Sequence, residues 1–172
     1  MKMQKLDVKW HTVITADDLM VDSVVNGVYA YEQGMVKLID NGMTQTAHGL
    51  MDYLDYDAAG KVVKIEGYEK LSLKLATFCK EVAERFKHSG PVTCHLFISP
   101  KGSNSFELHT DPDDVILHMV QGTKMLENPE HGFLITAGDT LRIPKNVEHR
   151  AVNLHSSLML SIGLEGWITE KL

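Results

Sequence analysis

The sequence is poor in cysteine and lacks any long apolar run, and both absences exclude classes of protein. Cys79 and Cys94 are the only cysteines in 172 residues, too few for a disulfide framework, and their scarcity predicts a reducing, cytoplasmic location. The longest apolar stretches, such as Leu158–Leu160, are far shorter than the roughly 20 residues that cross a bilayer. No basic leader followed by an apolar stretch begins the chain, so nothing indicates secretion. Neither a membrane nor export is expected.

Positive charge is also scarce. The 17 lysine and arginine residues are outnumbered by 23 aspartate and glutamate residues, which gives a formal net charge of −6, and no block of basic residues occurs. Because binding along a nucleic-acid backbone depends on clustered positive charge, nucleic acid is not an expected partner. The hydrophobic share of 44% is ordinary for a folded soluble chain, and this length has room for one domain.

The first part of the chain mixes helix and strand signals. The segment 15–18, Thr-Ala-Asp-Asp, is typical of the start of a short helix, because threonine and aspartate side chains accept hydrogen bonds from the free amides of a first turn. Segments 36–40 and 61–65 have the composition of short strands. Apolar residues at helical spacing predict a longer helix over 68–87.

The pattern changes at residue 92. From there, short runs rich in Val, Ile, Leu and Phe alternate with turn residues roughly every 8 to 12 positions, which is typical of an antiparallel sandwich or barrel. We therefore predict one structural domain with a mostly β core. In it, residues 92–172 form the core and residues 1–91 form a helical and strand segment that braces it.

Nine histidines stand out in the composition, and two of them belong to a candidate metal site. His109 and Asp111 are two residues apart, so on a strand their side chains would point to the same face. Turns at 138 and 144–146 predict a hairpin that returns His149 beside the strand carrying His109. Two histidines and one carboxylate form a facial triad, the ligand set that holds non-haem Fe(II) with positions left open.

The same region resembles the two motifs of the cupin superfamily. The second motif places Gly, Pro, His and Asn at fixed intervals, and those positions hold Gly138, Pro144, His149 and Asn153. Asn146 stands where the family has glycine, a mild departure because asparagine tolerates the left-handed backbone conformation. The first motif is matched in part: His109 and Gly122 fit, Asp111 replaces the second histidine, and Val115 replaces the usual glutamate.

One branch of that superfamily is resembled more specifically. The runs 97–115 (FISPKGSNSFELHTDPDDV) and 121–124 (QGTK) resemble the Jumonji-C-like 2-oxoglutarate oxygenases, among them the ribosomal-protein hydroxylases. This resemblance covers about 92–164. It implies a double-stranded β-helix, a cupin or jelly-roll barrel of about eight strands with N-terminal helices packed outside. In that barrel His109, Asp111 and His149 would hold Fe(II) and form the catalytic centre.

The resemblance also assigns the co-substrate. Lys124 occupies the position of the lysine that binds the distal carboxylate of 2-oxoglutarate. A lysine pointing into the barrel would otherwise be a buried, unpaired cation that costs several kcal/mol. The implied reaction is hydroxylation of a C–H bond in an amino-acid side chain or a small molecule. Three residues depart from the branch: Phe97 replaces a tyrosine that also holds the co-substrate, Gly163 replaces a serine or asparagine, and His95 replaces an asparagine.

Other roles and functions fit the same residues. We expect His95 to line the co-substrate pocket and His118 to be a satisfied core histidine. Arg142 and Arg150 are expected as rim charges. Phe97 and Gly163 leave open a cupin metalloenzyme that does not use 2-oxoglutarate, such as an isomerase or a direct dioxygenase. A non-catalytic ligand-binding cupin is the third reading, and a homodimer paired through sheet edges fits all three.

Overall fold

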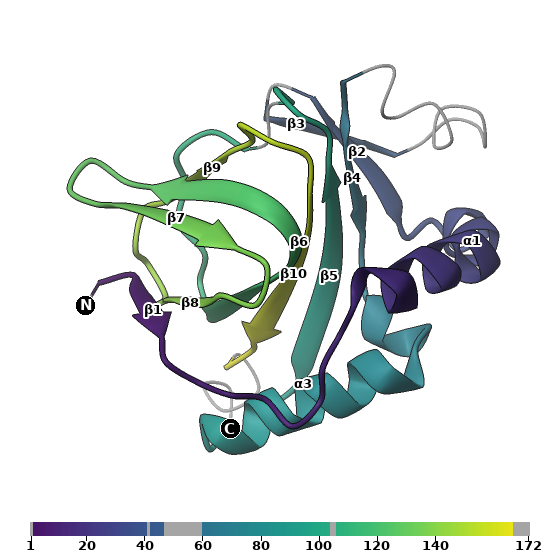
Figure 1. The fold of residues 1–172 in the computed structure, drawn as a ribbon, viewed down its shortest axis with the longest axis horizontal. Coiled ribbons are helices and arrows are strands. Elements are labelled where there is room, and N and C mark those ends of the chain that lie inside the picture. Colours follow the sequence, from purple (N-terminus) through teal and green to yellow (C-terminus); the bar gives the residue numbers. More distant parts are fainter. Residues whose placement is uncertain (1, 41, 47–59, 104–105, 167–172) are drawn as a thin grey trace.

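The computed structural model describes residues 2–40, 42–46, 60–103 and 106–166, in which strands dominate and helices lie outside them (Figure 1). The helical elements are α1 (Ala16–Glu32), the short 3-10 turn η1 (Tyr68–Lys70) and α3 (Leu73–Arg85). The strands are β1 (Gln4–Leu6), β2 (Val36–Asp40), β3 (Met43–Thr46), β4 (Val62–Ile65), β5 (Val92–Ser99), β6 (Asp114–Glu127), β7 (Gly132–Thr136), β8 (Thr140–Ile143), β9 (Arg150–Val152) and β10 (Ser157–Leu164). None of these helices combines the length and hydropathy that a membrane span requires.

The helix predicted from the segment 15–18 is confirmed and is longer than expected. The Thr15 hydroxyl accepts a hydrogen bond from the backbone N–H of Asp18 at 3.3 Å, and the Asp18 carboxylate accepts one from the Thr15 N–H at 2.9 Å. This reciprocal capping box satisfies two amides that have no partner inside a helix. The helix α1 then runs for 17 residues.

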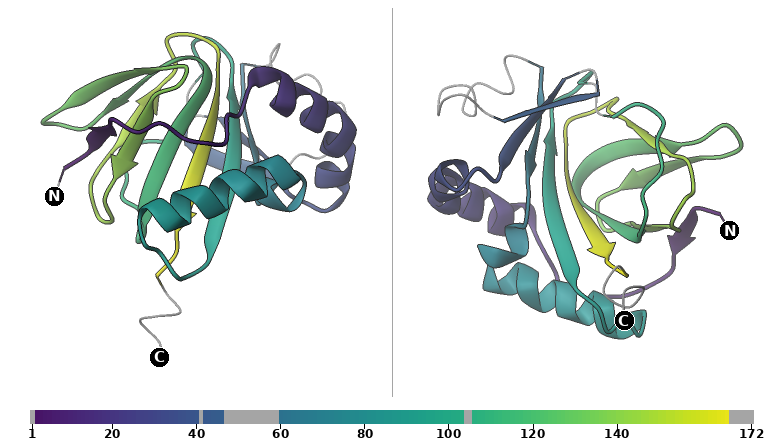
Figure 2. Two further views of the ribbon diagram at one scale, coloured as in Figure 1. Left: turned by 60° about the horizontal axis from the view of Figure 1, so that its bottom comes forward. Right: turned by 180° about the vertical axis from the view of Figure 1, so that it is seen from behind.

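The helix predicted over 68–87 is divided in the structure. Residues Tyr68–Lys70 form the separate turn η1, and α3 begins only after Ser72, whose extended backbone and hydroxyl cap the Leu75 amide at 3.2 Å. The apolar spacing nevertheless identified the buried face, because α3 packs Leu75, Phe78, Cys79 and Val82 against the sheet. Figure 2 shows α1 and α3 on the same side of the strands.

All strand pairs are antiparallel, and the strands follow the order β1-β8-β6-β10-β5-β4-β2-β3. The long strand β6 belongs to both halves of the barrel: its first half pairs with β8 and β10, and its second half pairs with β7 and β9. Strands β2 and β4 confirm the two strands predicted before residue 92, and β1 and β3 also join the sheet. The architecture is the predicted jelly-roll barrel with helices outside, and the boundary near residue 91 stays a prediction.

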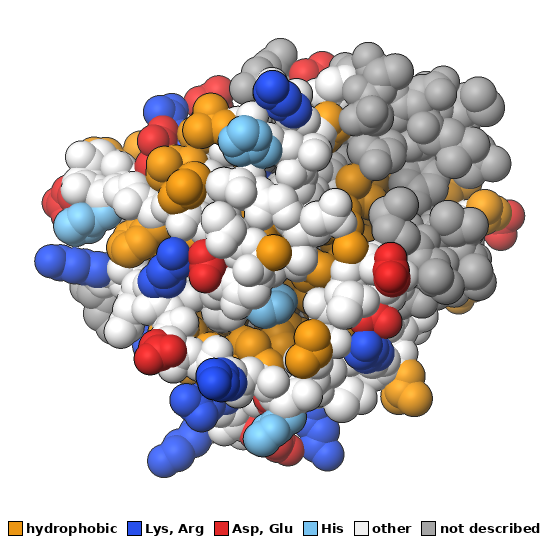
Figure 3. Space-filling model, in the orientation of Figure 1, with side chains coloured by type: hydrophobic (Ala, Val, Ile, Leu, Met, Phe, Trp, Pro, Cys, Tyr) orange, Lys and Arg blue, Asp and Glu red, His pale blue; other side chains and the backbone are white. Residues whose placement is uncertain are grey.

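Two apolar clusters divide along the alternating faces of β5. Cys94 and Leu96 point to an outer core between the sheet and the helices, together with Leu160 and Ile162 of β10. Phe97 points to a barrel core, which also contains Met159. Successive strand residues face opposite sides, so every second residue of β5 faces the barrel interior. On the face seen in Figure 3, acidic and basic side chains are interspersed.

Gly122 lies where β6 passes from one half of the barrel to the other. Its φ of +83° is left-handed, and a Cβ there would collide with the backbone carbonyl oxygen of Ser156 and lie 2.9 Å from the Ser157 Cα. Gly138 has a similar φ of +93°, yet a Cβ there would meet nothing within 4 Å.

The surroundings of Gly122 and Gly138 predict that alanine lowers the stability of the protein by different amounts at the two positions. Gly138→Ala should lower the free energy of unfolding by about 1–2 kcal/mol, the cost of a left-handed alanine. Gly122→Ala should lower it by about 3 kcal/mol or more, because the β6–β10 pairing must also shift. Urea denaturation measures both. Equal losses in the two variants would show that β6 and β10 do not meet as closely as described.

Candidate metal centre

His109 and His149 are joined through their backbones. Each donates its N–H to the carbonyl oxygen of the other, at 3.1 Å from His109 and 2.9 Å from His149, in an isolated antiparallel bridge. The predicted hairpin therefore does return His149 beside His109. The strand expected at 109–111 is reduced to this one bridge residue, and Asp111 lies in the loop before β6.

The hairpin turn also positions Asp111. Asn146, which replaces the glycine of the motif, has a left-handed φ of 64°, as its tolerance of that conformation predicted. Its backbone N–H donates to the Asp111 carbonyl oxygen at 2.8 Å. The turn at 144–146 thus fixes both the return of His149 and the loop that carries Asp111.

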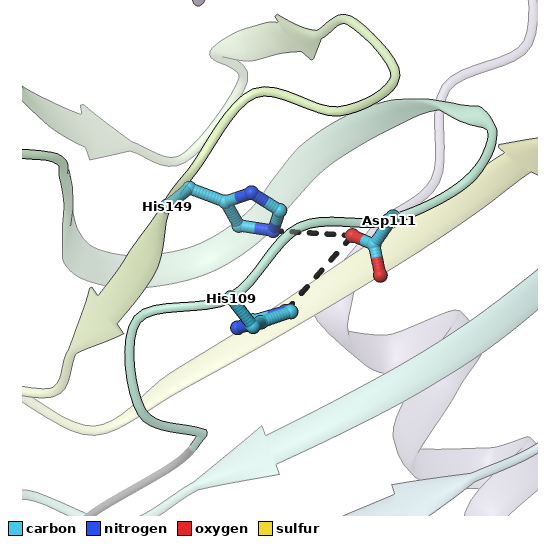
Figure 4. A group of neighbouring side chains, drawn as sticks. All are labelled: His109, Asp111 and His149. Atoms are coloured by element: carbon cyan, nitrogen blue, oxygen red, sulfur yellow. Dashed lines mark ion pairs between the residues drawn. The ribbon is translucent and has the colours of Figure 1, made fainter.

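The two imidazole rings are held in the same way. The Nδ1 atom of His109 lies 2.7 Å from the carbonyl oxygen of Glu107, and Nδ1 of His149 lies 2.9 Å from that of Val147. A carbonyl oxygen only accepts, so each Nδ1 carries the proton and each neutral ring keeps the lone pair of Nε2. Both Nε2 atoms face Asp111 (Figure 4): the distances to its Oδ2 are 3.2 Å from His149 and 3.9 Å from His109.

The charges in this cluster are coupled. When the His149 ring is protonated, its Nε2 donates to Asp111, and this hydrogen bond is the largest cause that lowers the pKa of Asp111 below its ordinary value, against the opposing effect of burial. Burial by itself would lower the pKa of His149, but hydrogen bonds to Asp111 and Val147 outweigh it and raise that pKa. Asp111 is therefore an anion near neutral pH, and its negative charge favours a cation between the rings.

The donor set fits a divalent metal ion. One ligand atom from each of His109, Asp111 and His149 lies within 4.8 Å of the other two. The His149 side chain is 8% exposed, whereas those of His109 and Asp111 are 35% and 37% exposed and border the opening. Nitrogen and oxygen donors converging from one side leave the opposite positions of an octahedral ion free.

A cavity of about 260 Å³ adjoins this cluster, and Lys124 also lines it. The Lys124 side chain is buried, and its ammonium donates to the Ser99 hydroxyl at 3.1 Å. No carboxylate among the described residues pairs with it. Burial lowers the pKa of Lys124 to about 7. The prediction that this lysine points into the barrel is confirmed, and a solvated hairpin lysine is excluded.

The other residues singled out in the sequence divide between the cavity and the outside. The cavity lining includes His95, Phe97 and Gly163. Co-substrate binding by His95 stays a prediction. His118 is buried with its ring bonded to the Thr140 hydroxyl at 3.0 Å, which makes it a satisfied core histidine.

The two arginines predicted as rim charges both form ion pairs. Arg142 forms an ion pair with Asp114 at 3.0 Å. Arg150 pairs with Glu127 at 2.8 Å. Asn104 and Ser105, inside the motif run, lie outside the described residues.

Five polar cavity residues were not predicted. They are Lys64 on β4, Thr93 on β5, Ser161 on β10, and Asp113 and Glu165 at the ends of β6 and β10. Lys64 is the most informative omission, because its strand precedes the region of resemblance. Lys64 alternates with the buried Val63 and Ile65 along β4. This alternation was the available signal, because it predicts that Lys64 points to the opposite face of the sheet from them, the face to which Phe97 also points.

No protein-family model and no curated protein sequence matches the chain. Solved structures do match. The chain is similar to YcfD, a ribosomal oxygenase from Escherichia coli, with a TM-score of 0.71 and 18% sequence identity over 95% of this chain and 47% of that one. It is similar to the same enzyme in complex with cobalt and 2-oxoglutarate, with a TM-score of 0.68, 17% identity, and coverage of 95% and 48%. The chain thus spans about half the length of these structures, and they show that it has their fold.

The cluster of His109, Asp111 and His149 predicts that metal affinity depends on His149 in particular and not on the number of histidines in the protein. His149→Ala should weaken binding of Co(II) by about 100-fold or more, since one of three ligands is removed. His155→Ala removes an exposed histidine and should leave the affinity unchanged. Isothermal titration calorimetry under one buffer compares the two. Equal affinities in the wild type and His149→Ala would place the metal elsewhere.

The buried lysine predicts a gain in stability when it is removed. The pKa of Lys124 falls from 10.5 to about 7 on folding, so protonated Lys124 opposes folding. The penalty is complete below pH 7 and disappears as the pH rises towards 10.5. Lys124→Met should therefore raise the free energy of unfolding by about 1–4 kcal/mol at pH 6, and by less at pH 9. A variant that is destabilised at pH 6 would contradict this assignment.

Proposed function

We propose that the protein is an Fe(II)- and 2-oxoglutarate-dependent oxygenase that hydroxylates a C–H bond of an amino-acid side chain or a small molecule. The observation that carries the proposal is the presence of two incomplete sites in one cavity. The triad of His109, Asp111 and His149 offers three ligand atoms on one side, and the buried Lys124 offers an ammonium without a carboxylate partner among the described residues. The fold shared with an oxygenase that binds cobalt and 2-oxoglutarate supports this proposal.

A dicarboxylate would complete both sites at once. Its distal carboxylate would neutralise Lys124, and its other end would reach the open positions of an ion held by the triad. Lys124 alone costs stability, and a partner that arrives with a negative charge offsets that cost. A lysine at such a position is therefore better explained by ligand binding than by folding.

Two departures from the related oxygenases are offset by neighbouring hydroxyl groups. Phe97 cannot donate a hydrogen bond, but the Ser99 hydroxyl, two residues further on the same face of β5, lies 3.1 Å from the Lys124 ammonium. Gly163 has no side chain, but the Thr93 hydroxyl lies 3.0 Å from where its Cβ would be. Polar groups are thus present near both positions.

The bound metal and co-substrate would activate O2: one oxygen atom would enter succinate as 2-oxoglutarate loses CO2, and the other would be inserted into the substrate C–H bond. The protein's part is to hold the three ligands from one side, anchor the co-substrate, and limit water. Leu117, Leu126 and Met159 form apolar parts of the cavity wall, which suits the last of these tasks.

Anaerobic titration with Fe(II) and 2-oxoglutarate tests the proposal. We expect a visible metal-to-ligand charge-transfer band in the wild type that is lost in His109→Ala and, at the same 2-oxoglutarate concentration, in Lys124→Met. Admission of oxygen should then convert 2-oxoglutarate to succinate. Lys101→Met, which removes an exposed lysine, is the control and should keep the band.

The outcomes separate the three readings. Bound iron without the band would favour a metalloenzyme that does not use 2-oxoglutarate. Absence of metal binding in the wild type would favour a non-catalytic binding module. Either result would contradict the proposal.

A further inference from the structure

Lys124 differs from the other lysine of the cavity in having no acidic partner. It lies on β6 and is only 1% exposed. Its Nζ lies 3.1 Å from the Ser99 hydroxyl, and no carboxylate in the described part of the chain pairs with it. Lys64 lines the same cavity but lies 3.4 Å from the Glu66 carboxylate. The cavity therefore contains one paired and one unpaired lysine.

The carboxylates that line the cavity lie away from Lys124 in the sheet. Asp111 lies 3.2 Å from Nε2 of His149 and belongs to the metal cluster. Asp113 and Glu165 flank one end of the pairing between β6 and β10, and Lys124 lies beyond the other end of that pairing. An acidic lining therefore does not supply this lysine with an ion pair.

The immediate surroundings of Lys124 are largely apolar. Ile135 of β7 lies opposite it in the sheet, and the centroid of the Phe97 ring is 5.9 Å from its Nζ. Leu126, the next residue on the same face of β6, and Met159 add apolar cavity wall. An ammonium loses its hydration here without gaining an opposite charge, so the neutral amine is favoured. Burial lowers the pKa of Lys124 to about 7, which populates the neutral form near neutral pH.

The neutral form of this side chain is a nucleophile, whereas an ammonium has no lone pair to donate. The Ser99 hydroxyl can accept one N–H of the amine, which leaves the lone pair of Nζ free. Condensation with an aldehyde or ketone converts a neutral amine into a neutral imine, so no charge is buried. A charged product would incur the same desolvation cost that disfavours the ammonium. The site therefore favours uncharged carbonyl compounds.

We propose that Lys124 is a covalent binding site for small uncharged aldehydes or ketones, which it captures as an imine. The Nζ lone pair attacks the carbonyl carbon, a C–N bond forms, and the electron pair of the C=O bond moves to oxygen. One proton passes from nitrogen to oxygen. The second N–H proton and the hydroxyl group then leave as water, and the C=N bond forms without an oxidant or a reductant. This activity goes beyond the proposed oxygenase, in which the protonated form of the same lysine binds a carboxylate.

The test treats the wild-type protein with propanal and sodium cyanoborohydride at pH 7, in the absence of metal and 2-oxoglutarate. Propanal is uncharged and small enough for a cavity of about 260 Å³. Cyanoborohydride delivers a hydride to the imine carbon and so converts the imine into a stable secondary amine. Peptide mass spectrometry then measures the rate of propylation at each lysine. The N-terminal amine is counted separately, because its ordinary pKa is about 8.

We expect Lys124 to be propylated at least about tenfold faster than Lys64 or Lys101. Lys64 shares the cavity but is held as an ammonium by Glu66, and Lys101 is an exposed lysine whose ammonium is hydrated. A rate at Lys124 equal to or below those of the two controls would overturn the inference.

A pair of variants at Ser99 tests whether the missing acidic partner is the cause. Ser99→Asp keeps the lysine but places a carboxylate beside it, so the ammonium is stabilised and propylation of Lys124 should slow by about tenfold or more. Ser99→Asn introduces a side chain of similar size without the charge and should change the rate by less than about threefold. Circular dichroism checks that both variants are folded. Equal rates in the two variants would contradict the inference.

Glutarate separates this inference from the proposed function, because it has both carboxylates of 2-oxoglutarate but lacks the ketone. If the co-substrate binds Lys124, saturating glutarate should protect this lysine from propylation. Fast propylation that glutarate does not prevent supports the imine site and contradicts the assignment of Lys124 to the co-substrate. A normal charge-transfer band together with slow propylation rejects the imine site alone.

Discussion

The two backbone hydrogen bonds between His109 and His149 hold the candidate metal centre together. They join a loop before β6 to the end of a hairpin 40 positions later in the chain, and they bring the two ring nitrogens to one carboxylate. Each ring is then turned by a carbonyl two residues before it, so the tautomer is decided by the backbone and not by chance contacts. Since His149 directly precedes β9, which pairs with β6, the ligand geometry is a consequence of the fold.

The cavity beside this bridge contains a buried lysine that lowers the stability of the fold. An apolar residue in place of Lys124 would make the barrel more stable, because a buried ammonium loses its hydration and, among the described residues, gains only the Ser99 hydroxyl as a partner. Lys64 avoids that cost by pairing with Glu66, which directly follows β4. The two lysines therefore differ in kind. Lys64 has a carboxylate partner, whereas Lys124 has none among the described residues.

The sequence was sufficient for the metal cluster and the barrel, because both rest on local patterns. Turn residues at 138 and 144–146 specify the hairpin, and the left-handed Asn146 shows how closely the motif follows backbone conformation. Lys64 and Ser161 could not be found in the same way. They reach the cavity only through the pairing of β4 and β10 with β5, and the register of strands far apart in the chain is not encoded by any short motif. The division of the helix at Ser72 was not predicted, because the apolar residues keep helical spacing on both sides of this cap. Spacing alone therefore does not reveal where the helix begins.

A crystal structure with Mn(II) and 2-oxoglutarate, with the metal located by its anomalous scattering, tests the central claim most directly. We expect one anomalous peak bound by Nε2 of His109, Nε2 of His149 and the Asp111 carboxylate, with the distal carboxylate of 2-oxoglutarate on the Lys124 ammonium. A peak at another position, or a co-substrate carboxylate that does not contact Lys124, would contradict the account.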